Sequence, residues 1–444
     1  MAGGTWTNQS KVRPGVYLRF KTGKMTGLTV GERGVVAIAK ALPWGPSGVT
    51  VLEAGQNMTP VTGFDLLTPQ NRFLQEIFKG TNRTPAPRSV LLCRIEGSGA
   101  AKASVTIGTL TTTARYNGTR GNDISIAITA QTEPEDTFLV TTIVDGNVAD
   151  QQQGASVADL TDNAWVSFSG TGALTADTGK PLTGGNDGTV NAADYSDFLT
   201  AIEPYSFDVL IYDGQDPTIK TAFQTFVKRI VEESGVYTQL VAANLTNPDS
   251  RFCINVTTGV QIDDGTKLTP EETTWWVGGA TAGARYNQDL THAVYPGAVD
   301  TLTKLTSAQY EQGIKEGKFL LLAEDGAVKV EYDINSLVTY TPDIGEIFRY
   351  NRVMRLCNTI ANDVYRQFSN GFIGTVDNNE VGRGQFKAVI VGYLLQIQDS
   401  NGIQNFEPDD VEVLPGEAID AILVNIAIQP VGSVNKIYIT IEVS

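Results

Sequence analysis

The only histidine in this 444-residue chain is His292, in the run Leu290-Thr-His-Ala-Val294. Serine or cysteine nucleophiles usually need a histidine base within hydrogen-bonding reach, so such a site would have to be built around this residue. A catalytic zinc site of the usual kind needs several imidazoles, which one histidine cannot supply. No nucleophile–base motif surrounds His292, and we expect it to be a structural or surface residue.

Three cysteines, Cys93, Cys253 and Cys357, are widely separated and flanked by apolar residues. Their odd number and their spacing do not fit a disulfide framework or a zinc site. We expect reduced thiols in the core.

Two glycine-rich stretches invite comparison with phosphate-binding loops, Gly278-Gly279-Ala-Thr-Ala-Gly283 and Gly382-Arg383-Gly384. Neither matches a phosphate loop or a strand-GxGxxG-helix unit. The first lies inside a predicted helix, where small residues permit close packing. We therefore predict no nucleotide or other cofactor.

Acidic residues stand in patterns that local structure explains. Asn186-Asp187-Gly188 and Asp263-Asp264-Gly265 are typical of turns and lack the spacing of a calcium loop. Glu271-Glu272 follow Thr269-Pro270, where acids in a first helical turn complement the helix dipole. We predict no catalytic residue and no metal site. The sequence alone does not exclude a carboxylate-dependent hydrolase, such as a glycosidase with two acids roughly 5–10 Å apart.

Composition narrows the function classes further. The chain has 41% apolar residues and a net charge of −16, so it should fold throughout, in two to four domains, and repel polyanions. No apolar run approaches the roughly 20 residues of a membrane span, and the N-terminus resembles no secretory signal. We expect synthesis in the cytoplasm, no nucleic-acid partner and no membrane insertion.

The charge changes sign along the chain. Residues 1–90 carry a net charge of +7, residues 91–190 carry −6, residues 191–345 carry −12, and residues 346–444 carry −5. The basic first segment suggests contact with acidic surface, either of its own fold or of a neighbouring copy. A solvated basic face is the alternative.

The same cuts separate different patterns of secondary structure. Short alternating runs between residues 101 and 187 predict an all-β insert, and alternating helix and strand patterns from 192 to 333 predict an α/β layer. Glu346–Phe368 has helical periodicity. Three strands are predicted after it, at Phe386–Ile397, Ala418–Gln429 and Val434–Val443. The predicted fold class is α+β or α/β, with several domains.

Both chain ends contain a strand pattern with one apolar face. The N-terminal pattern lies within Lys11–Phe20, and the alternating apolar residues of the two ends are Val16, Leu18, Phe20, Ile437, Ile439, Ile441 and Val443. Unpaired strands recruit other chains, so these strands either pair within the subunit or add to the sheet of a neighbour.

Five segments, taken in order, resemble the contractile tail sheath proteins of bacteriophages, prophages of Gram-positive type and phage-tail-like bacteriocins. They are Pro14-Gly-Val-Tyr17, Arg115-Tyr-Asn-Gly-Thr-Arg-Gly-Asn-Asp123, Leu182-Thr-Gly-Gly-Asn-Asp-Gly188, Gly374-Thr-Val-Asp-Asn-Asn-Glu-Val-Gly-Arg383 and the strand Ile437–Val443.

The resemblance implies a structural, non-enzymatic subunit that polymerises as stacked hexameric rings around an inner tail tube and contracts to drive that tube through a cell envelope. Residues 1–90 and 346–444 would form a core domain with the terminal arms, with a β-rich insert at 91–190 and an α/β domain at 191–345. The implied partners are other copies of itself, the inner tail tube protein, and baseplate and terminator proteins. The assembled tail particle would be extracellular after release. A non-contractile shell or surface-layer protein is the alternative reading.

The predicted helix over Glu346–Phe368 adds a candidate contact. Its apolar stripe is centred near Cys357 and Val364, and four arginines fall on the opposite face: Arg349, Arg352, Arg355 and Arg366. We expect these guanidinium groups either to be solvated or to face acidic groups of the tube.

Overall fold

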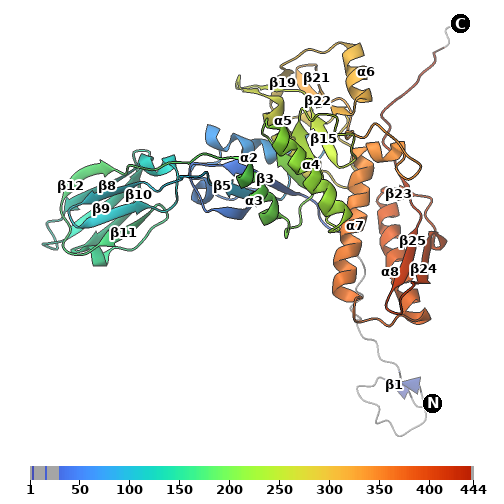
Figure 1. Cartoon of the computed structure of the whole chain (residues 1–444), viewed down its shortest axis with the longest axis horizontal. Coiled ribbons are helices and arrows are strands. Elements are labelled where there is room, and N and C mark those ends of the chain that lie inside the picture. The colour runs from blue at the N-terminus through green and yellow to red at the C-terminus, as the bar shows by residue number, and fades with distance from the viewer. Residues whose placement is uncertain (1–2, 5–15, 18–29, 442–444) are drawn as a thin grey trace.

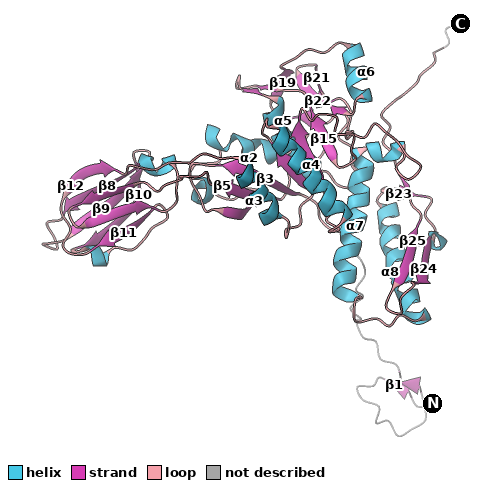
Figure 2. Ribbon diagram, viewed as in Figure 1, coloured by secondary structure: helices cyan, strands magenta, loops and turns pink. Residues whose placement is uncertain are grey.

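The computed structural model describes residues 3–4, 16–17 and 30–441. Figure 1 shows a β-sandwich at one end, an α/β body in the middle and a helical region at the other end. Figure 2 shows how strands dominate the first body and helices the last. The predicted mixed α/β fold with several domains is confirmed.

A seven-stranded sheet forms the centre of the middle body, in the order β20-β15-β14-β13-β3-β5-β4. Only β4 runs antiparallel to its neighbour. The central strands are apolar runs buried on both faces, as expected for a parallel sheet covered by helices. The strands are β3 (Val35–Ala41), β4 (Gly48–Glu53), β5 (Ser89–Ile95), β13 (Val209–Tyr212), β14 (Gln239–Ala243), β15 (Cys253–Val256) and β20 (Lys318–Phe319).

Residues before position 96 thus contribute three strands to the sheet of the α/β segment, while Val30 packs against the C-terminal helices. The short pieces between β4 and β5 are α1 (Thr59–Thr62), η1 (Pro69–Asn71) and α2 (Arg72–Ile77). Farther towards the N-terminus, β1 (Gly3–Gly4) and β2 (Val16–Tyr17) form a parallel pair.

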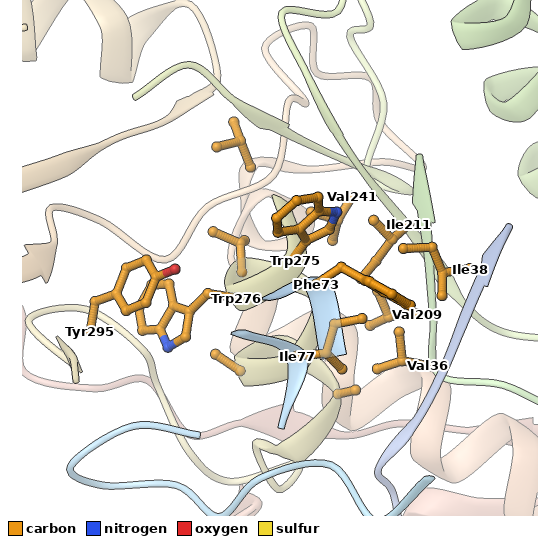
Figure 3. Packing of buried hydrophobic residues seen from close by; sticks show 14 of the residues in the cluster. Val36, Ile38, Phe73, Ile77, Val209, Ile211, Val241, Trp275, Trp276 and Tyr295 are labelled. Atoms are coloured by element: carbon orange, nitrogen blue, oxygen red, sulfur yellow. The ribbon is translucent and has the colours of Figure 1, made fainter. Parts of the chain in front are cut away.

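Helices cover both faces of the central sheet. On one face, α5 (Pro270–Gly283) and α2 pack against β3, β13 and β14, and Figure 3 shows Trp275, Trp276 and Phe73 in this cluster. On the other face lie α3 (Ala192–Ile202) and α4 (Pro217–Glu232). A Cβ at Gly278 would overlap Ile211 of β13, and one at Gly279 would overlap the backbone of Ile77 in α2, so these small residues permit close packing, as predicted.

Two small sheets and a helix extend the middle body. The strands of the first are β16 (Val260–Ile262), β17 (Lys267–Leu268) and β19 (Ala298–Thr301), and those of the second are β18 (Val294–Tyr295), β21 (Leu321–Glu324) and β22 (Ala327–Val330). The helix is α6 (Ser307–Lys315), which follows a capping box at Thr306.

The β-rich insert consists of two sheets, in the orders β10-β9-β8-β12 and β11-β7-β6. Its strands are β6 (Ser104–Ile107), β7 (Leu110–Ala114), β8 (Ile124–Ala130), β9 (Phe138–Val144), β10 (Asn147–Gly154), β11 (Val166–Gly170) and β12 (Asp177–Pro181), with the short helices η2 (Thr119–Asp123) and η3 (Val157–Asp159). Trp44, from the loop after β3, is 1% exposed and packs into the core of this sandwich.

The C-terminal region contains two long helices that lie side by side (Figure 1). They are α7 (Asn351–Gly371), preceded by η4 (Glu346–Arg349), and α8 (Glu380–Asp399). The hairpin of β24 (Val411–Pro415) and β25 (Ile422–Ile426) packs against α8. The remaining elements are β23 (Ile403–Gln404), η5 (Pro408–Asp410) and β26 (Gln429–Pro430). The helix predicted over Glu346–Phe368 is thus present as η4 and α7.

Two of the strands predicted here are wrong, and a third is only partly correct. Phe386–Ile397 belongs to α8, because a short apolar run reads alike in a buried strand and a buried helix, and Asn379 caps a helix here. Ala418–Gln429 contains a strand only at β25. The part of Val434–Val443 that the structure describes has no strand partner, so its alternation alone does not make a ladder.

Candidate assembly surfaces

Within the part of the chain that the structure describes, His292 does not lie beside a serine or cysteine nucleophile. His292 is exposed, in a left-handed backbone conformation (φ 60°), at a pocket of about 430 Å³. Glu311 and Glu331 also line this pocket, and burial raises the pKa of Glu331, but no serine or cysteine does. Among the described residues, no group of three or more histidine, cysteine or acidic side chains is placed to hold a metal ion.

The three cysteines are free thiols. Cys93 and Cys253 are buried, and burial raises their pKa values to about 11 and about 12. Cys357 is partly buried in α7, and its pKa is raised to about 11 for the same reason. These thiols stay protonated at neutral pH, in line with the predicted structural role.

The C-terminal arm, residues 434–441, leaves the body as an extended segment (Figure 1). Ile437, Ile439 and Ile441 are 74%, 77% and 81% exposed, and Tyr438 on the opposite face is 90% exposed. Among the described residues, no backbone hydrogen bond joins this arm to the rest of the subunit. Neither its backbone groups nor its apolar side chains are therefore satisfied within one copy.

The root of the arm is fixed to the C-terminal region. The backbone N–H of Val431 donates to the carbonyl of Gly402 at 3.0 Å, and Arg352 Nη1 donates to Ser433 Oγ at 2.6 Å. Asn435 Nδ2 donates weakly to Asp289 Oδ2 at 3.4 Å. The direction in which the arm leaves is thus set by α7 and its neighbours.

The β24–β25 hairpin offers a matching surface. Each of its strands pairs only with the other among the described strands, which leaves an open edge on both sides. Leu414, Leu423 and Ile426 on these strands are 38%, 51% and 36% exposed. An open edge with apolar side chains accepts an added strand readily.

The remaining predicted arm residues are described only in part. Val16 lies in β2, and nothing further is described of its side chain. Leu18, Phe20 and Val443 lie outside the described residues. The structure therefore places three of the seven predicted arm residues, Ile437, Ile439 and Ile441, on one exposed segment.

The four arginines do not share one exposed face. Arg355 is 0% exposed, so its predicted place on a free surface of the helix is wrong. Arg349 lies in η4 and donates to the carbonyl of Ile314, and Arg352 is half-buried at the arm root. Only Arg366 has a largely exposed side chain, at 57%. The prediction failed because α7 is covered on more than the one side that its apolar stripe indicates.

A buried polar network explains the position of Arg355. Its Nη2 lies 2.5 Å from Asp333 Oδ2, and the side chains are 0% and 1% exposed. Asn351 donates to the other oxygen of Asp333 at 2.9 Å and accepts from Gln239 of β14 at 3.1 Å. This network fastens the first turns of α7 to the central sheet. Sequence reasoning missed Asp333 and Asn351, since nothing in their spacing relates them to Arg355.

A second polar cluster ties the start of the described chain to α7. Asp363 Oδ2 accepts from the backbone N–H of Gly31 at 2.9 Å and from the hydroxyl of Tyr393 at 2.8 Å. Burial raises the pKa of the Asp363 carboxyl. Asp208 accepts from the backbone N–H groups of Gly34 and Val35. The segment 31–35 is thereby held between the central sheet and the C-terminal helices.

Two of the glycine- and asparagine-rich motifs meet at the neck of the β-sandwich. Asn122 donates to the carbonyl of Gly185 and accepts from its N–H, at 3.0 and 2.9 Å. Asp187 Oδ1 accepts from the backbone N–H of Thr119 at 2.7 Å. Arg120, in the same stretch, forms a two-pronged ion pair with Asp145 at 2.6 and 2.5 Å. These motifs are structural, and they close the sandwich at its two chain connections.

Comparisons with known proteins agree with this architecture. The phage tail sheath protein beta-sandwich domain matches residues 97–187, the central domain matches residues 188–336, and the C-terminal domain matches residues 343–444. The phage-like element PBSX protein XkdK of Bacillus subtilis is 34% identical, with 100% of both chains covered. The chain belongs to the phage tail sheath protein family.

Solved structures give the same answer. The sheath tail protein of Desulfitobacterium hafniense is 38% identical, with a TM-score of 0.86 over 96% of this chain and 99% of that chain. The helical sheath of the anti-feeding prophage in its contracted state has a TM-score of 0.60 at 13% identity, over 97% of this chain and 99% of that one. It shares the fold.

The resemblance to tail sheaths is therefore confirmed. As a tail sheath protein the chain is a structural component of a contractile tail and not an enzyme, so the carboxylate-dependent hydrolase is set aside. Within residues 30–441 and the described pairs before them, no helix has the length and apolar character that crossing a membrane requires.

Proposed function

We propose that copies of this chain polymerise as stacked hexameric rings around an inner tail tube, and that contraction of the polymer drives the tube through a cell envelope. The observation that carries this proposal is the C-terminal arm, whose isoleucines are 74–81% exposed and whose backbone is unpaired within the subunit. The contracted sheath of the anti-feeding prophage, which has the same fold, supports it.

The arm links copies by strand addition. Ile437, Ile439 and Ile441 of one copy become buried when the arm pairs with an open edge of the β24–β25 hairpin in another copy. Main-chain hydrogen bonds form the link, and the arm's own hydrogen bonds to its body lie at its root, at Ser433 and Asn435. The N-terminal strand pattern around Val16 provides a second link of the same kind.

The other partners are the inner tail tube protein and the baseplate and terminator proteins at the two ends of the polymer. In this scheme the C-terminal region faces the tube, and Arg366 on α7 is the arginine exposed enough to meet acidic groups there. The chain is made in the bacterial cytoplasm, and the assembled tail particle is extracellular after release.

Contraction needs no nucleotide in this proposal. The extended polymer is metastable, and its copies gain better contacts when they rearrange. The sequence motifs and the pockets offer no phosphate loop that would argue for nucleotide-driven motion.

Electron microscopy of the purified full-length chain, alone and co-produced with its tube protein, tests the proposal. Hollow tubes that exist in a long and narrow form and in a short and wide form are expected. Mild denaturant in ATP-free buffer should convert the first into the second. Flat lattices would instead indicate a surface-layer protein, and monomers at all concentrations would argue against a sheath.

A further inference from the structure

A pocket of about 470 Å³ lies between the segment 30–33, the loop before β5, the end of α5 and the end of α8. Three arginines line it: Arg33, Arg88 and Arg285. Among the described residues that line it, Glu32 is the only acidic one. The lining of the pocket is therefore basic, although the net charge of the whole chain is −16.

Arg33 is the strongest indication that the pocket receives an anion. Its side chain is only 7% exposed, and Nη1 lies 3.3 Å from Asp208 Oδ1. Nevertheless, neither Nε nor Nη1 makes a hydrogen bond to any described residue. Asp208 faces Arg33 through Oδ1, while its Oδ2 accepts from the backbone N–H groups of Gly34 and Val35. A buried guanidinium group with unused donors is costly unless a further acceptor reaches it.

Arg88 and Arg285 complete the arrangement. Both are exposed, and the guanidinium group of neither makes a hydrogen bond or ion pair with the described residues. Arginine forks suit carboxylates because two parallel N–H groups meet two oxygens. Asp208 and Asp363 lie near Arg33, whereas only Glu32 among the described lining residues is acidic beside Arg88 and Arg285. The outer part of the pocket therefore keeps an excess of positive charge.

The chain's own N-terminal segment cannot provide the missing carboxylate. Residues 1–31 contain no aspartate or glutamate, and they include the basic residues Lys11, Arg13, Arg19, Lys21 and Lys24. A second copy, in contrast, carries many exposed acids, since residues 91–444 have a net charge of −23. Charge complementarity therefore favours another copy as the source.

We propose that Arg33, Arg88 and Arg285 form a carboxylate-binding pocket that receives an acidic side chain from a second copy of this chain. The proposal rests on the proposed function only in requiring that copies associate. It adds to the strand links a contact that is charged, directional and weakened by salt, because its outer arginines are exposed.

The first experiment reverses the two exposed charges. Arg88→Glu with Arg285→Glu should raise the concentration needed for polymerisation about tenfold or more at low salt. Lys102→Glu with Lys228→Glu is the matched control, since it changes the net charge equally at exposed lysines away from the pocket. Unfolding curves of both double variants should match wild type. Equal polymerisation of the two double variants would overturn the proposal and leave the proposed function intact.

The second experiment identifies what enters the pocket. A photo-reactive benzoylphenylalanine at position 285 should cross-link to an Asp- or Glu-containing peptide of another copy, recognised by mixing isotopically light and heavy chains. Calorimetric titration of the same chain with free glutarate, and with inorganic phosphate, asks whether a small anion is the occupant instead. Binding of either anion without cross-links between copies would overturn the proposal, as would neither binding nor cross-links. If wild type forms no polymers, the proposed function is wrong. The presence or absence of cross-links between copies then tests the carboxylate-binding pocket on its own.

Discussion

Arg355 and Asp333 form an ion pair that is buried from solvent on both sides, with Nη2 and Oδ2 2.5 Å apart. Asp333 lies beyond the last strand of the middle body, and Arg355 lies in the second turn of α7. The pair joins the two regions through charge rather than through apolar packing, so it depends on both partners being present.

Removing one partner of this pair should destabilise the subunit strongly. Arg355→Ala leaves Asp333 buried without its counter-ion, which costs about 3–5 kcal/mol by analogy with other buried pairs. Urea unfolding followed by circular dichroism measures this, and Lys228→Ala, at an exposed lysine on α4, is the control expected to stay within about 0.5 kcal/mol of wild type. Equal stabilities of the two variants would show that the pair contributes nothing.

Loss of the C-terminal arm should abolish polymerisation while leaving the subunit folded. Truncation after Lys436 removes residues that make no backbone hydrogen bond to the described body, so the unfolding temperature should not change. Electron microscopy and sedimentation should then find only single subunits. Normal tubes from this truncated chain would refute the linking role of the arm.

The side chains of the arm can be tested separately from its backbone. Ile437→Ser, Ile439→Ser and Ile441→Ser in one chain keep the main-chain donors but remove the apolar surface that strand addition buries. Polymerisation should weaken markedly. Leu67→Ser, at a residue that is 82% exposed outside both the arm and the β24–β25 hairpin, is the control and should polymerise as wild type does.

Substitutions of His292 should change the strain of the backbone at this position without affecting assembly or contraction. Its φ of 60° suits asparagine far better than alanine. His292→Asn should therefore fold, polymerise and contract as wild type does. His292→Ala should also assemble as wild type does, but its free energy of unfolding should be lower by roughly 1 kcal/mol. A folded His292→Asn chain that cannot contract would show that the imidazole itself is needed.

Stability should fall at alkaline pH because of the buried thiols. Burial raises the pKa of Cys253 from 9.0 to about 12, so above pH 9 the unfolded chain loses a proton that the folded chain keeps. The folded state is then disfavoured by up to about 1.4 kcal/mol per pH unit for each such thiol, and below pH 9 the effect vanishes. Unfolding measured from pH 8 to 11 should show a shallower loss for Cys253→Ala than for wild type. Identical slopes would contradict the assignment.

Arg366 is the arginine of α7 to test against the tube. Arg366→Glu should weaken association of sheath with tube at low salt, and added salt should reduce the difference from wild type, because an exposed pair is screened. Co-sedimentation of subunits with preformed tubes measures both effects. Lys228→Glu is the control for the change in net charge. Unchanged co-sedimentation of Arg366→Glu would show that Arg366 does not contact the tube.

The sequence predicted some helices correctly because their local signals are specific to a helix. Thr269-Pro270 marked the start of α5 because a capping residue followed by proline has few other meanings, and the periodicity of α7 was clear over six turns. In Val389-Ile-Val391 of α8 the local preference pointed to a strand, and tertiary packing against α7 decided otherwise. The run was too short for its period to arbitrate.

The sequence also predicted one feature of the candidate surfaces and missed others. The isoleucines of the arm were singled out because their alternation is visible in the sequence itself, although the sequence left open whether they pair within the subunit. The burial of Arg355 was not found, because its partner Asp333 comes from a different element and a hydrophobic stripe shows only one of the sides on which a helix is covered. The pocket around Arg33 was also missed, since its arginines come from three separate segments of the chain.

The closure at the neck of the β-sandwich has a consequence for how the chain reaches its fold. β3 must pair with β13, although the whole sandwich is synthesised between them. The bridges Ser98↔Thr189, Ala101↔Asn186 and Ser104↔Thr183 bring the two ends of this insert together. If the sandwich folds first as it leaves the ribosome, it turns a long loop into a short one and lowers the entropy lost when the central sheet closes. In that order of events the outer body forms first, and the bridges at the neck then bring β3 and β13 close enough to pair.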